Sequence, residues 1–149
     1  MFVAVDLDGT LCDGSHKVHL LTLPKCPTSG WVDQDWTAWR EACIDDKAIV
    51  PVLETVKALV AAKHKVEFWT GRGKACEQIT RQWLHRFGLD KLPIRMRDDN
   101  MGEVPDHVWK RNYLEWYGRP DLILEDRVAV VNMWREEGIM CFQVAPGDY

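Results

Sequence analysis

The sequence predicts an α/β fold: one domain with a mostly parallel sheet and helices on both faces. Short apolar runs rich in β-forming residues alternate with amphipathic segments along the chain, and three of these runs end in polar residues. The 149 residues are enough for one ordinary domain with a buried core. Ligands of such folds bind beyond the carboxyl ends of the strands.

Each element follows from a local pattern. The apolar run 2–5 predicts a strand that ends in a glycine-containing turn. Residues 12–50 are less regular and are interpreted as a small cap or lid within the single domain 1–149, with a helix over about 34–44. Proline at position 51 suits a first helical residue, and Gly88 and Gly118 suit helix ends. The remaining predicted elements are helices from 51 to about 61 and over 74–87, 106–117 and 127–137, and strands over 65–69, 93–96, 122–124 and 140–144.

Composition and charge narrow the function classes. Nineteen basic against 23 acidic residues give a net charge of −4, so we expect no binding of long duplex nucleic acid by counterion release. A local basic pocket for one or two phosphates remains compatible with this charge. The five cysteines lack C-x-x-C spacing and favour reduced thiols in a cytoplasm. We expect no export signal and no membrane segment, and the oligomeric state stays open.

Carboxylates gather where two predicted strands end. Asp6 and Asp8 follow the first strand, and Glu125 and Asp126 follow the strand over 122–124. Four carboxylates at one edge of a sheet repel one another unless a cation lies among them. Oxygen ligands select a hard ion, and Mg²⁺ is the natural choice beside a phosphate.

Groups that can bind phosphate complete the pattern. Thr70 offers a hydroxyl and Gly71 a backbone N–H at the end of another strand, and Lys110 would balance the charge. Each motif alone is weak: the first is often a polar turn, and Lys110 alone is most often a solvated helix residue. Their joint occurrence in this order, each at a strand end, is harder to explain by chance.

These motifs resemble the haloacid-dehalogenase-like (HAD) phosphohydrolases. Residues 2–10 match the hhhhDxDGT pattern of that superfamily, residues 66–72 match its strand ending in Thr, Lys110 matches its lysine, and residues 122–126 match its acidic pair. The resemblance implies a HAD-like (Rossmannoid) domain. The segments 126–127, 130–135 and 141–149 further resemble the 3′-phosphatase part of phage polynucleotide kinase-phosphatase and stand-alone phage phosphatases. Localisation would then be the host cytoplasm.

The resemblance also implies roles for individual residues. Asp6 is the expected nucleophile that forms an aspartyl-phosphate, and Asp8 the expected general acid and base. Asp8 is expected to keep its proton because a like-charged neighbour disfavours a second ionisation. Mg²⁺ would be held by Asp6, by the backbone carbonyl of Asp8 and by Asp126, with Glu125 in support. The expected phosphate-binding group comprises Lys110 and Gly9, Thr10, Thr70, Gly71, Arg72, Arg97 and Arg127.

The predicted function is a Mg²⁺-dependent phosphomonoester hydrolase that removes 3′-phosphates from polynucleotide ends. A phosphatase of free nucleotides or other small phosphomonoesters is the alternative within enzymes. A receiver-like, phosphate-sensing binding module and a silent scaffold that presents a tryptophan-rich surface are the alternatives outside enzymes. Glu125 replaces an aspartate of the relatives, the cap is longer than theirs, and the kinase half is absent. Trp31, Trp36 and Trp39 are expected to form the core of the cap, although one of them could stack on a nucleobase.

Overall fold

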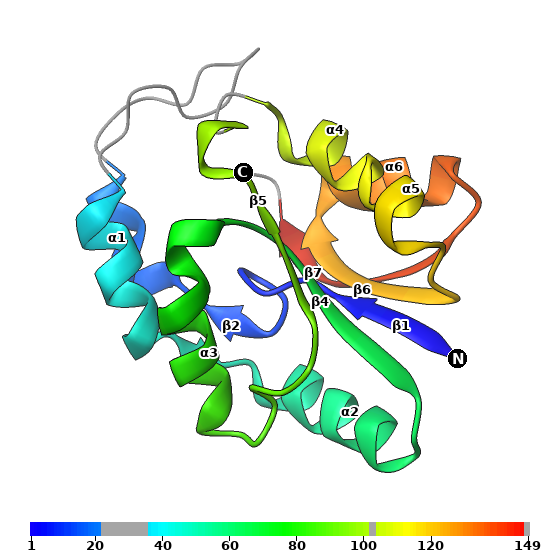
Figure 1. Cartoon of the computed structure of the whole chain (residues 1–149), viewed down its shortest axis with the longest axis horizontal. Coiled ribbons are helices and arrows are strands. Elements are labelled where there is room, and N and C mark those ends of the chain that lie inside the picture. Colours follow the sequence, from blue (N-terminus) through cyan, green and yellow to red (C-terminus); the bar gives the residue numbers. More distant parts are fainter. Residues whose placement is uncertain (22–35, 102–103, 148–149) are drawn as a thin grey trace.

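Five strands form the central sheet of the computed structural model, which describes residues 1–21, 36–101 and 104–147. Their order is β5-β4-β1-β6-β7, and each neighbouring pair is parallel (Figure 1). The predicted α/β fold with a mostly parallel sheet is confirmed. The bounds are β1 Phe2–Val5, β4 Lys65–Gly73, β5 Ile94–Arg97, β6 Leu122–Arg127 and β7 Met140–Gly147.

The register of the three inner strands brings their carboxyl ends together. Val5 of β1 lies beside Phe68 of β4 and Leu124 of β6. The residue after Val5 is Asp6, and its backbone N–H donates to the carbonyl of Leu124 at 3.0 Å. Asp6 therefore emerges at the same level as Glu125, at the edge of the sheet where ligands bind in such folds.

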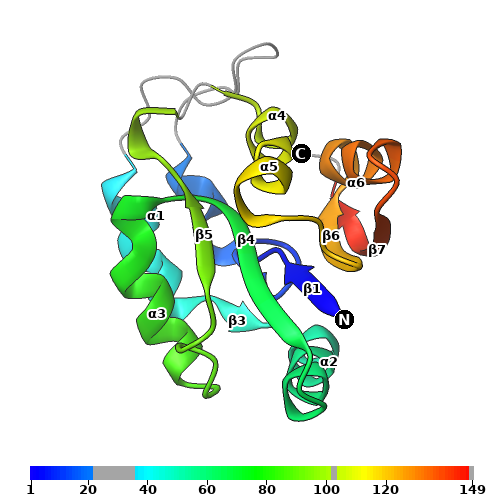
Figure 2. The same cartoon turned by 45° about the vertical axis from the view of Figure 1, so that its right-hand side comes forward.

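Helices cover both faces of the sheet, as Figure 2 shows. One face packs against α2 (Val50–Ala61) and α3 (Glu77–His85), and the other against α4 (Asp106–Arg111), α5 (Tyr113–Tyr117) and α6 (Val128–Glu136). Successive strand side chains point to opposite faces, so Val3 and Val5 join the first core and Ala4 joins the second.

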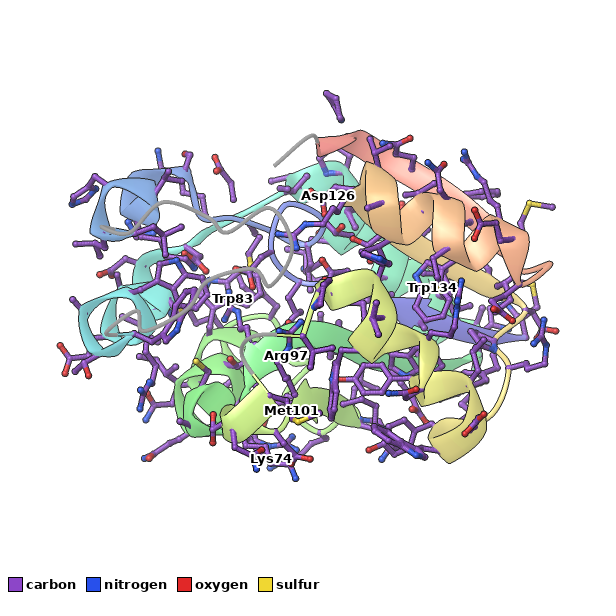
Figure 3. The ribbon with its side chains drawn as sticks, turned by 90° about the horizontal axis from the view of Figure 1, so that it is seen from above. Lys74, Trp83, Arg97, Met101, Asp126 and Trp134 are labelled. Atoms are coloured by element: carbon purple, nitrogen blue, oxygen red, sulfur yellow. The ribbon has the colours of Figure 1, made fainter. Side chains whose placement is uncertain are left out.

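The second core is aromatic. Trp69 of β4 lies at its centre, with ring centroids 5.5 Å from Tyr113 and 5.8 Å from Trp134, a residue of α6 (Figure 3). Tilted and edge-to-face arrangements such as these suit the ring quadrupoles. The hydroxyl of Tyr113 donates to the backbone carbonyl of Thr70 at 3.1 Å. This core therefore supports the end of β4, where Thr70 lies.

Several elements differ from the predicted bounds. Residues 106–117 form two helices because the N–H of Asn112 bonds the carbonyl of Trp109, three residues back instead of four. The predicted helix 74–87 begins as a 3₁₀ turn over Lys74–Cys76 and becomes α-helical only at Glu77. β4 and β7 continue to Gly73 and Gly147, beyond the ends of their apolar runs. Both extensions follow shifts in strand register, and an alternation pattern does not reveal such shifts.

The segment between β1 and α2 contains a two-stranded antiparallel sheet. β2 (Cys12–Asp13) pairs with β3 (Lys47–Ala48), and between them lie 3₁₀ helices over Ser15–Leu20 and Cys43–Asp45 and helix α1 (Thr37–Ala42). The predicted helix over 34–44 is thus a shorter α-helix followed by a 3₁₀ turn, with 34 and 35 outside the described residues. Across the described parts of the chain, every helix is too short or too polar to cross a membrane.

Candidate active site

Lys110 joins the carboxylates that end two neighbouring strands. Its Nζ donates to Asp6 Oδ1 at 2.8 Å and to Glu125 Oε2 at 2.9 Å. The lysine side chain is 1% exposed, so its charge is almost fully desolvated. Burial alone would lower the pKa of Lys110, but the carboxylates of Asp106, Asp6 and Glu125 outweigh it and raise the pKa. Lys110 is therefore a fixed positive charge beside Asp6.

Asp6, Glu125 and Asp126 form a group that can hold a cation. One carboxylate oxygen from each lies within 4.8 Å of the others, and all three residues are buried. Three carboxylates against the single ammonium of Lys110 leave two negative charges. Burial raises the pKa of Asp6, and the Glu125 carboxylate raises it further, as expected for acids crowded together. The all-oxygen donor set and the excess charge both fit Mg²⁺.

Glu125 uses both of its oxygens within the protein. Oε2 accepts from Lys110, and Oε1 accepts from the backbone N–H groups of Asp126 at 3.2 Å and Arg127 at 3.3 Å. Burial raises the pKa of Glu125. These contacts agree with a supporting position behind the other two acids, where Glu125 holds the turn after β6.

The side chain of Thr10 points into the protein and contacts Asp126. Its hydroxyl is fully buried and donates to Asp126 Oδ1 at 3.0 Å. Gln143 of β7 donates from Nε2 to the backbone carbonyl of Asp126 at 3.0 Å. Asp126 is thereby held through its side chain by Thr10 and through its backbone by Gln143.

Asp8 lies among different partners from Asp6. Arg72 donates two hydrogen bonds to its carboxylate, from Nε to Oδ2 and from Nη2 to Oδ1, both at 2.7 Å. Lys17 Nζ lies 3.4 Å from Oδ1. Burial alone would raise the pKa of Asp8, but Arg72 and Lys17 outweigh it and lower the pKa. The expectation that a like-charged neighbour keeps Asp8 protonated was therefore wrong, because the groups that bind its carboxylate are the cations Arg72 and Lys17.

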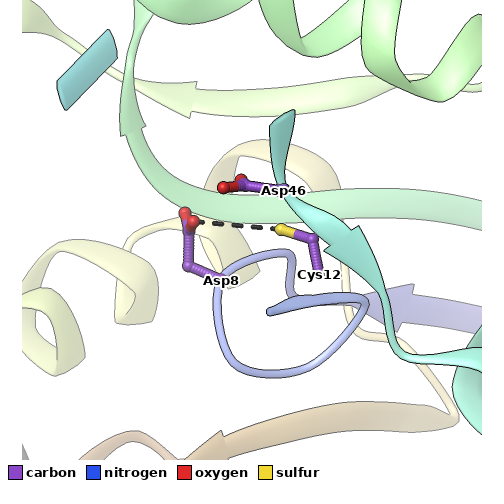
Figure 4. A group of neighbouring side chains, drawn as sticks. All are labelled: Asp8, Cys12 and Asp46. Carbon is purple, nitrogen blue, oxygen red and sulfur yellow. Dashed lines mark hydrogen bonds between the residues drawn. The ribbon is translucent and has the colours of Figure 1, made fainter. Parts of the chain in front are cut away.

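A buried aspartate in the cap, Asp46, balances the two cations of Asp8. It accepts from Lys17 at 2.6 Å and from Arg72 at 2.7 Å, and its side chain is fully buried. Asp46 lies close to Asp8 and Cys12, with the Cys12 thiol 3.9 Å from Asp8 Oδ1 (Figure 4). The two carboxylates and the two cations of this group cancel in charge. Unlike the group of Asp6, Glu125 and Asp126, it therefore has no excess negative charge for a metal ion to neutralise.

The remaining predicted phosphate-binding residues take two kinds of position. Arg72 is 4% exposed and directs its guanidinium at Asp8, Asp46 and the hydroxyl of Thr80. Arg97 donates to Asp106 Oδ1 at 2.9 Å and to the carbonyl of Val104 at 2.9 Å. The guanidinium groups of Arg72 and Arg97 are thus engaged within the protein, where they hold loops together.

Arg127 keeps 26% of its side chain exposed and lies 3.8 Å from Asp106 Oδ2. Thr70 Oγ1 accepts from the N–H of Arg72 at 3.1 Å, which leaves its hydroxyl hydrogen to donate elsewhere. Gly9 takes the left-handed conformation, φ +84°, and its N–H donates to the carbonyl of Cys12 at 2.9 Å. Of these groups, Arg127 keeps the side chain that a phosphate can reach, whereas Thr70 is fully buried.

Sequence reasoning missed three charged residues that complete the site. Asp106 pairs with Arg97, lies 3.3 Å from Lys110 and packs against Gly71, where an added Cβ would come within 2.5 Å of its Oδ1. Its i, i+4 spacing from Lys110 was a usable signal. Lys17 and Asp46 carried none, because they lie in the irregular segment 12–50.

Trp36 and Trp39 do not belong to either hydrophobic core among the described residues. Their rings meet edge to face at 5.5 Å, and Lys17 Nζ lies 4.3 Å from the centre of the Trp39 ring. The third tryptophan of the predicted cap core, Trp31, lies outside the described residues.

Comparison with known proteins now adds to this geometry. Residues 34–149 match the family described as the polynucleotide kinase PNKP phosphatase domain. The chain belongs to this family. The predicted HAD phosphatase resembling the polynucleotide kinase-phosphatase is therefore confirmed at the level of the family.

Among curated proteins, this PNKP-type chain is 31% identical over 100 residues to a putative bifunctional polynucleotide kinase/RNA ligase of Autographa californica nuclear polyhedrosis virus. The alignment covers 61% of this chain and 14% of that protein. The PNKP-type chain thus corresponds to a small part of this viral relative.

Among solved structures, a chain of the Pnkp1/Rnl/Hen1 RNA repair complex superposes with a TM-score of 0.78 at 26% identity, over 99% of this chain and 43% of that one. A class C acid phosphatase from Bacillus anthracis with tungstate bound superposes with a TM-score of 0.65 at 13% identity, over 98% and 66%. At that identity the second likeness speaks for the fold alone.

Proposed function

We propose that the chain is a Mg²⁺-dependent phosphomonoester hydrolase that works through a covalent aspartyl-phosphate. The observation that carries the proposal is the buried group of Asp6, Glu125 and Asp126 with Lys110 at the carboxyl ends of β1 and β6. Membership of the PNKP phosphatase-domain family supports the same reaction. Mg²⁺ would be held by Asp6, Asp126 and the Asp8 carbonyl, and would supply charge neutralisation on the phosphate.

The first step is an in-line attack by the Asp6 carboxylate on phosphorus. A bond forms between an Asp6 oxygen and phosphorus as the bond to the leaving oxygen breaks. Lys110 neutralises charge on the phosphoryl oxygens, and the Thr70 hydroxyl and Gly71 N–H donate to them. In the second step, water attacks the phosphorus, which releases inorganic phosphate and restores Asp6.

Asp8 moves the protons in both steps. Without substrate it is ionised beside Arg72 and Lys17, which suits a base that takes a proton from the attacking water. To act as an acid in the first step, Asp8 must first gain a proton. The negative charge of the bound phosphate raises the pKa of a neighbouring carboxylate and so favours that proton.

We propose a 3′-phosphorylated polynucleotide end as the substrate. Support comes from the family match and from the names of the relatives, a polynucleotide kinase/RNA ligase and an RNA repair complex. The buried, unpaired thiols of Cys12, Cys43, Cys76 and Cys141 support a reducing, cytoplasmic location. Free nucleotides are the second candidate class, because the net charge of −4 favours a small phosphate over a long polyanion.

A panel of phosphate-release assays with Mg²⁺ tests this function. It contains 3′-phosphorylated DNA and RNA oligonucleotides, 3′- and 5′-mononucleotides and sugar phosphates at equal concentration. The highest kcat/KM is expected for a 3′-phosphorylated oligonucleotide. A preference for mononucleotides would replace this substrate but keep the reaction. No turnover of any substrate, p-nitrophenyl phosphate included, would favour the phosphate-sensing module instead.

A further inference from the structure

We propose that Gly147 and Gln143 of β7 are positioning residues that hold Asp126 where it can bind the metal. The proposal rests on the metal-dependent function proposed above. It concerns β7, the last strand that the structure describes, and neither residue contributes a ligand atom itself. Three observations support it: the shift in register between β6 and β7, the lack of a side chain at position 147, and a hydrogen bond from Gln143.

The first observation is a bulge in β7 beside Asp126. Glu125 pairs with Gln143, and Arg127 pairs with Gly147, so a step of two residues on β6 is matched by four on β7. Three residues of β7, 144–146, thus lie opposite the single residue Asp126, and the two extra residues let β7 leave β6 and return to it on the far side of Asp126. Bulges of this kind occur next to active sites, where they redirect a side chain.

The second observation is the close approach of Gly147 to Asp126. A Cβ at position 147 would lie 2.6 Å from Asp126 Oδ2 and 2.7 Å from both the carbonyl carbon and the carbonyl oxygen of Asp126. Among the described glycines, those with positive φ are Gly9, Gly88, Gly118 and Gly138, and Gly147 is not one of them. Space, and not backbone conformation, therefore requires glycine here.

The contact cannot be relieved by the Asp126 side chain alone. Rotation of the carboxylate would move Oδ2 away, but the backbone carbonyl would still lie 2.7 Å from the new Cβ. Either β7 withdraws or the backbone of Asp126 moves. A move of the Asp126 backbone displaces its carboxylate from its place beside Asp6 and Glu125, and a withdrawal of β7 removes the hydrogen bond from Gln143 that holds that backbone.

The third observation is the hydrogen bond from Gln143. Its Nε2 donates to the carbonyl of Asp126 at 3.0 Å, while the Thr10 hydroxyl donates to Oδ1 at 3.0 Å. Hydrogen bonds thus fix the backbone carbonyl and Oδ1 of Asp126, and Gly147 packs against the other carboxylate oxygen, Oδ2. Groups that orient metal ligands in this way typically contribute 10- to 100-fold to metal affinity.

The experiment measures Mg²⁺ binding by isothermal titration calorimetry on the full chain, with no substrate present. G147A is expected to weaken binding by about 10- to 100-fold, and Q143M, which removes the donor at similar length, by a smaller factor. G88A is the matched control: nothing lies within 4 Å of its new Cβ, but its φ of +72° is strained for alanine. It should lower the melting temperature and leave the Mg²⁺ affinity of the chain unchanged.

Each outcome decides the question. Folded G147A that binds Mg²⁺ within twofold of the wild type overturns the proposal. If G147A does not fold, unchanged affinity in Q143M overturns it. A wild-type chain that hydrolyses p-nitrophenyl phosphate but binds no Mg²⁺ refutes the metal site and the positioning role together, while the phosphatase reaction stands.

Discussion

Asp6 and Asp8 lie two residues apart on one turn, but their carboxylates have opposite surroundings. Burial and the neighbouring Glu125 raise the pKa of Asp6, and Lys110 is the one cation close to it in the described part of the chain. Asp8 is held by Arg72 and Lys17, which lower its pKa. Pairs of acids whose environments push their pKa values apart commonly divide acid, base and nucleophile roles between them.

Replacing Asp6 by Asn should abolish turnover and leave the fold intact. The amide is nearly isosteric with the carboxylate but cannot attack phosphorus. Loss of a nucleophile typically costs at least about 10³-fold in rate. Steady-state assays with p-nitrophenyl phosphate measure the loss, and circular dichroism confirms the fold. Residual activity above one part in about 10³ would refute the covalent role.

Asp8→Asn should slow the first step in proportion to the leaving group's need for a proton. A ribose alkoxide needs one, whereas a nitrophenolate leaves readily without it. General acid catalysis is typically worth about 10²–10⁴ in rate, so phosphoryl transfer from a nucleotide 3′-phosphate should slow by that factor and transfer from p-nitrophenyl phosphate far less. Single-turnover measurements separate this step from hydrolysis of the intermediate. Equal slowing of both substrates would assign Asp8 to metal binding or structure, with Glu125 the next candidate acid.

At the scale of elements, buried charges join the cap to the sheet. Lys17 and Asp46 come from the segment between β1 and α2, and Arg72 comes from β4. The carbonyl of Asp46 also accepts from the Trp83 indole of α3 at 2.7 Å. The cap therefore supplies one counter-ion of Asp8, Lys17, and β4 supplies the other, Arg72.

Asp46→Asn should destabilise the chain by about 3–5 kcal/mol, because it leaves Lys17 and Arg72 buried with Asp8 as the one carboxylate that still contacts them among the described residues. Urea unfolding measures the change. Asp45→Asn is the control, because Asp45 is the exposed neighbour and should change stability by less than about 0.5 kcal/mol. A similar small change in both variants would mean that the buried cluster contributes little to stability.

At the scale of the whole molecule, activity should depend on a divalent cation. EDTA should abolish turnover and Mg²⁺ should restore it, because Asp6, Glu125 and Asp126 carry two more negative charges than Lys110 neutralises. Mg²⁺ should also raise the melting temperature, since a ligand that binds only the folded state stabilises it. Asp126→Ala should raise the Mg²⁺ concentration needed for half-maximal activity. Full activity in EDTA would contradict the metal site.

Acid stability should depend on Asp8. Its folded-state pKa lies below the unfolded value of about 3.9, so its ionised form stabilises the folded chain at all pH values above the unfolded pKa. That contribution is lost as the pH falls below about 4 towards the folded pKa. Urea midpoints between pH 5 and pH 2 should therefore fall less steeply in Asp8→Asn than in the wild type. Parallel slopes would mean that Asp8 is not the group that titrates.

Local patterns along the sequence were enough to predict the strands and the side chains at their ends. The apolar runs predicted the five central strands, and the turn after β1 and the polar ends of β4 and β6 predicted which side chains meet at the sheet edge. Parallel strands put their carboxyl ends on one edge, so this inference needed no knowledge of the loops. Lys110 was predicted in the same group and lies 2.8 Å from Asp6.

The counter-ion that each carboxylate meets depends on how distant segments of the chain pack together. Asp8 was expected to keep a proton, but Lys17 and Arg72 reach it from segments whose local patterns say nothing about that contact. Similarly, Gly147 looks like an ordinary turn residue until the bulge in β7 brings it against Asp126. Periodicity reports how a segment meets the core, whereas pKa values and close contacts depend on distances between segments far apart in the chain. Those distances are set by packing, and packing is a property of the whole fold.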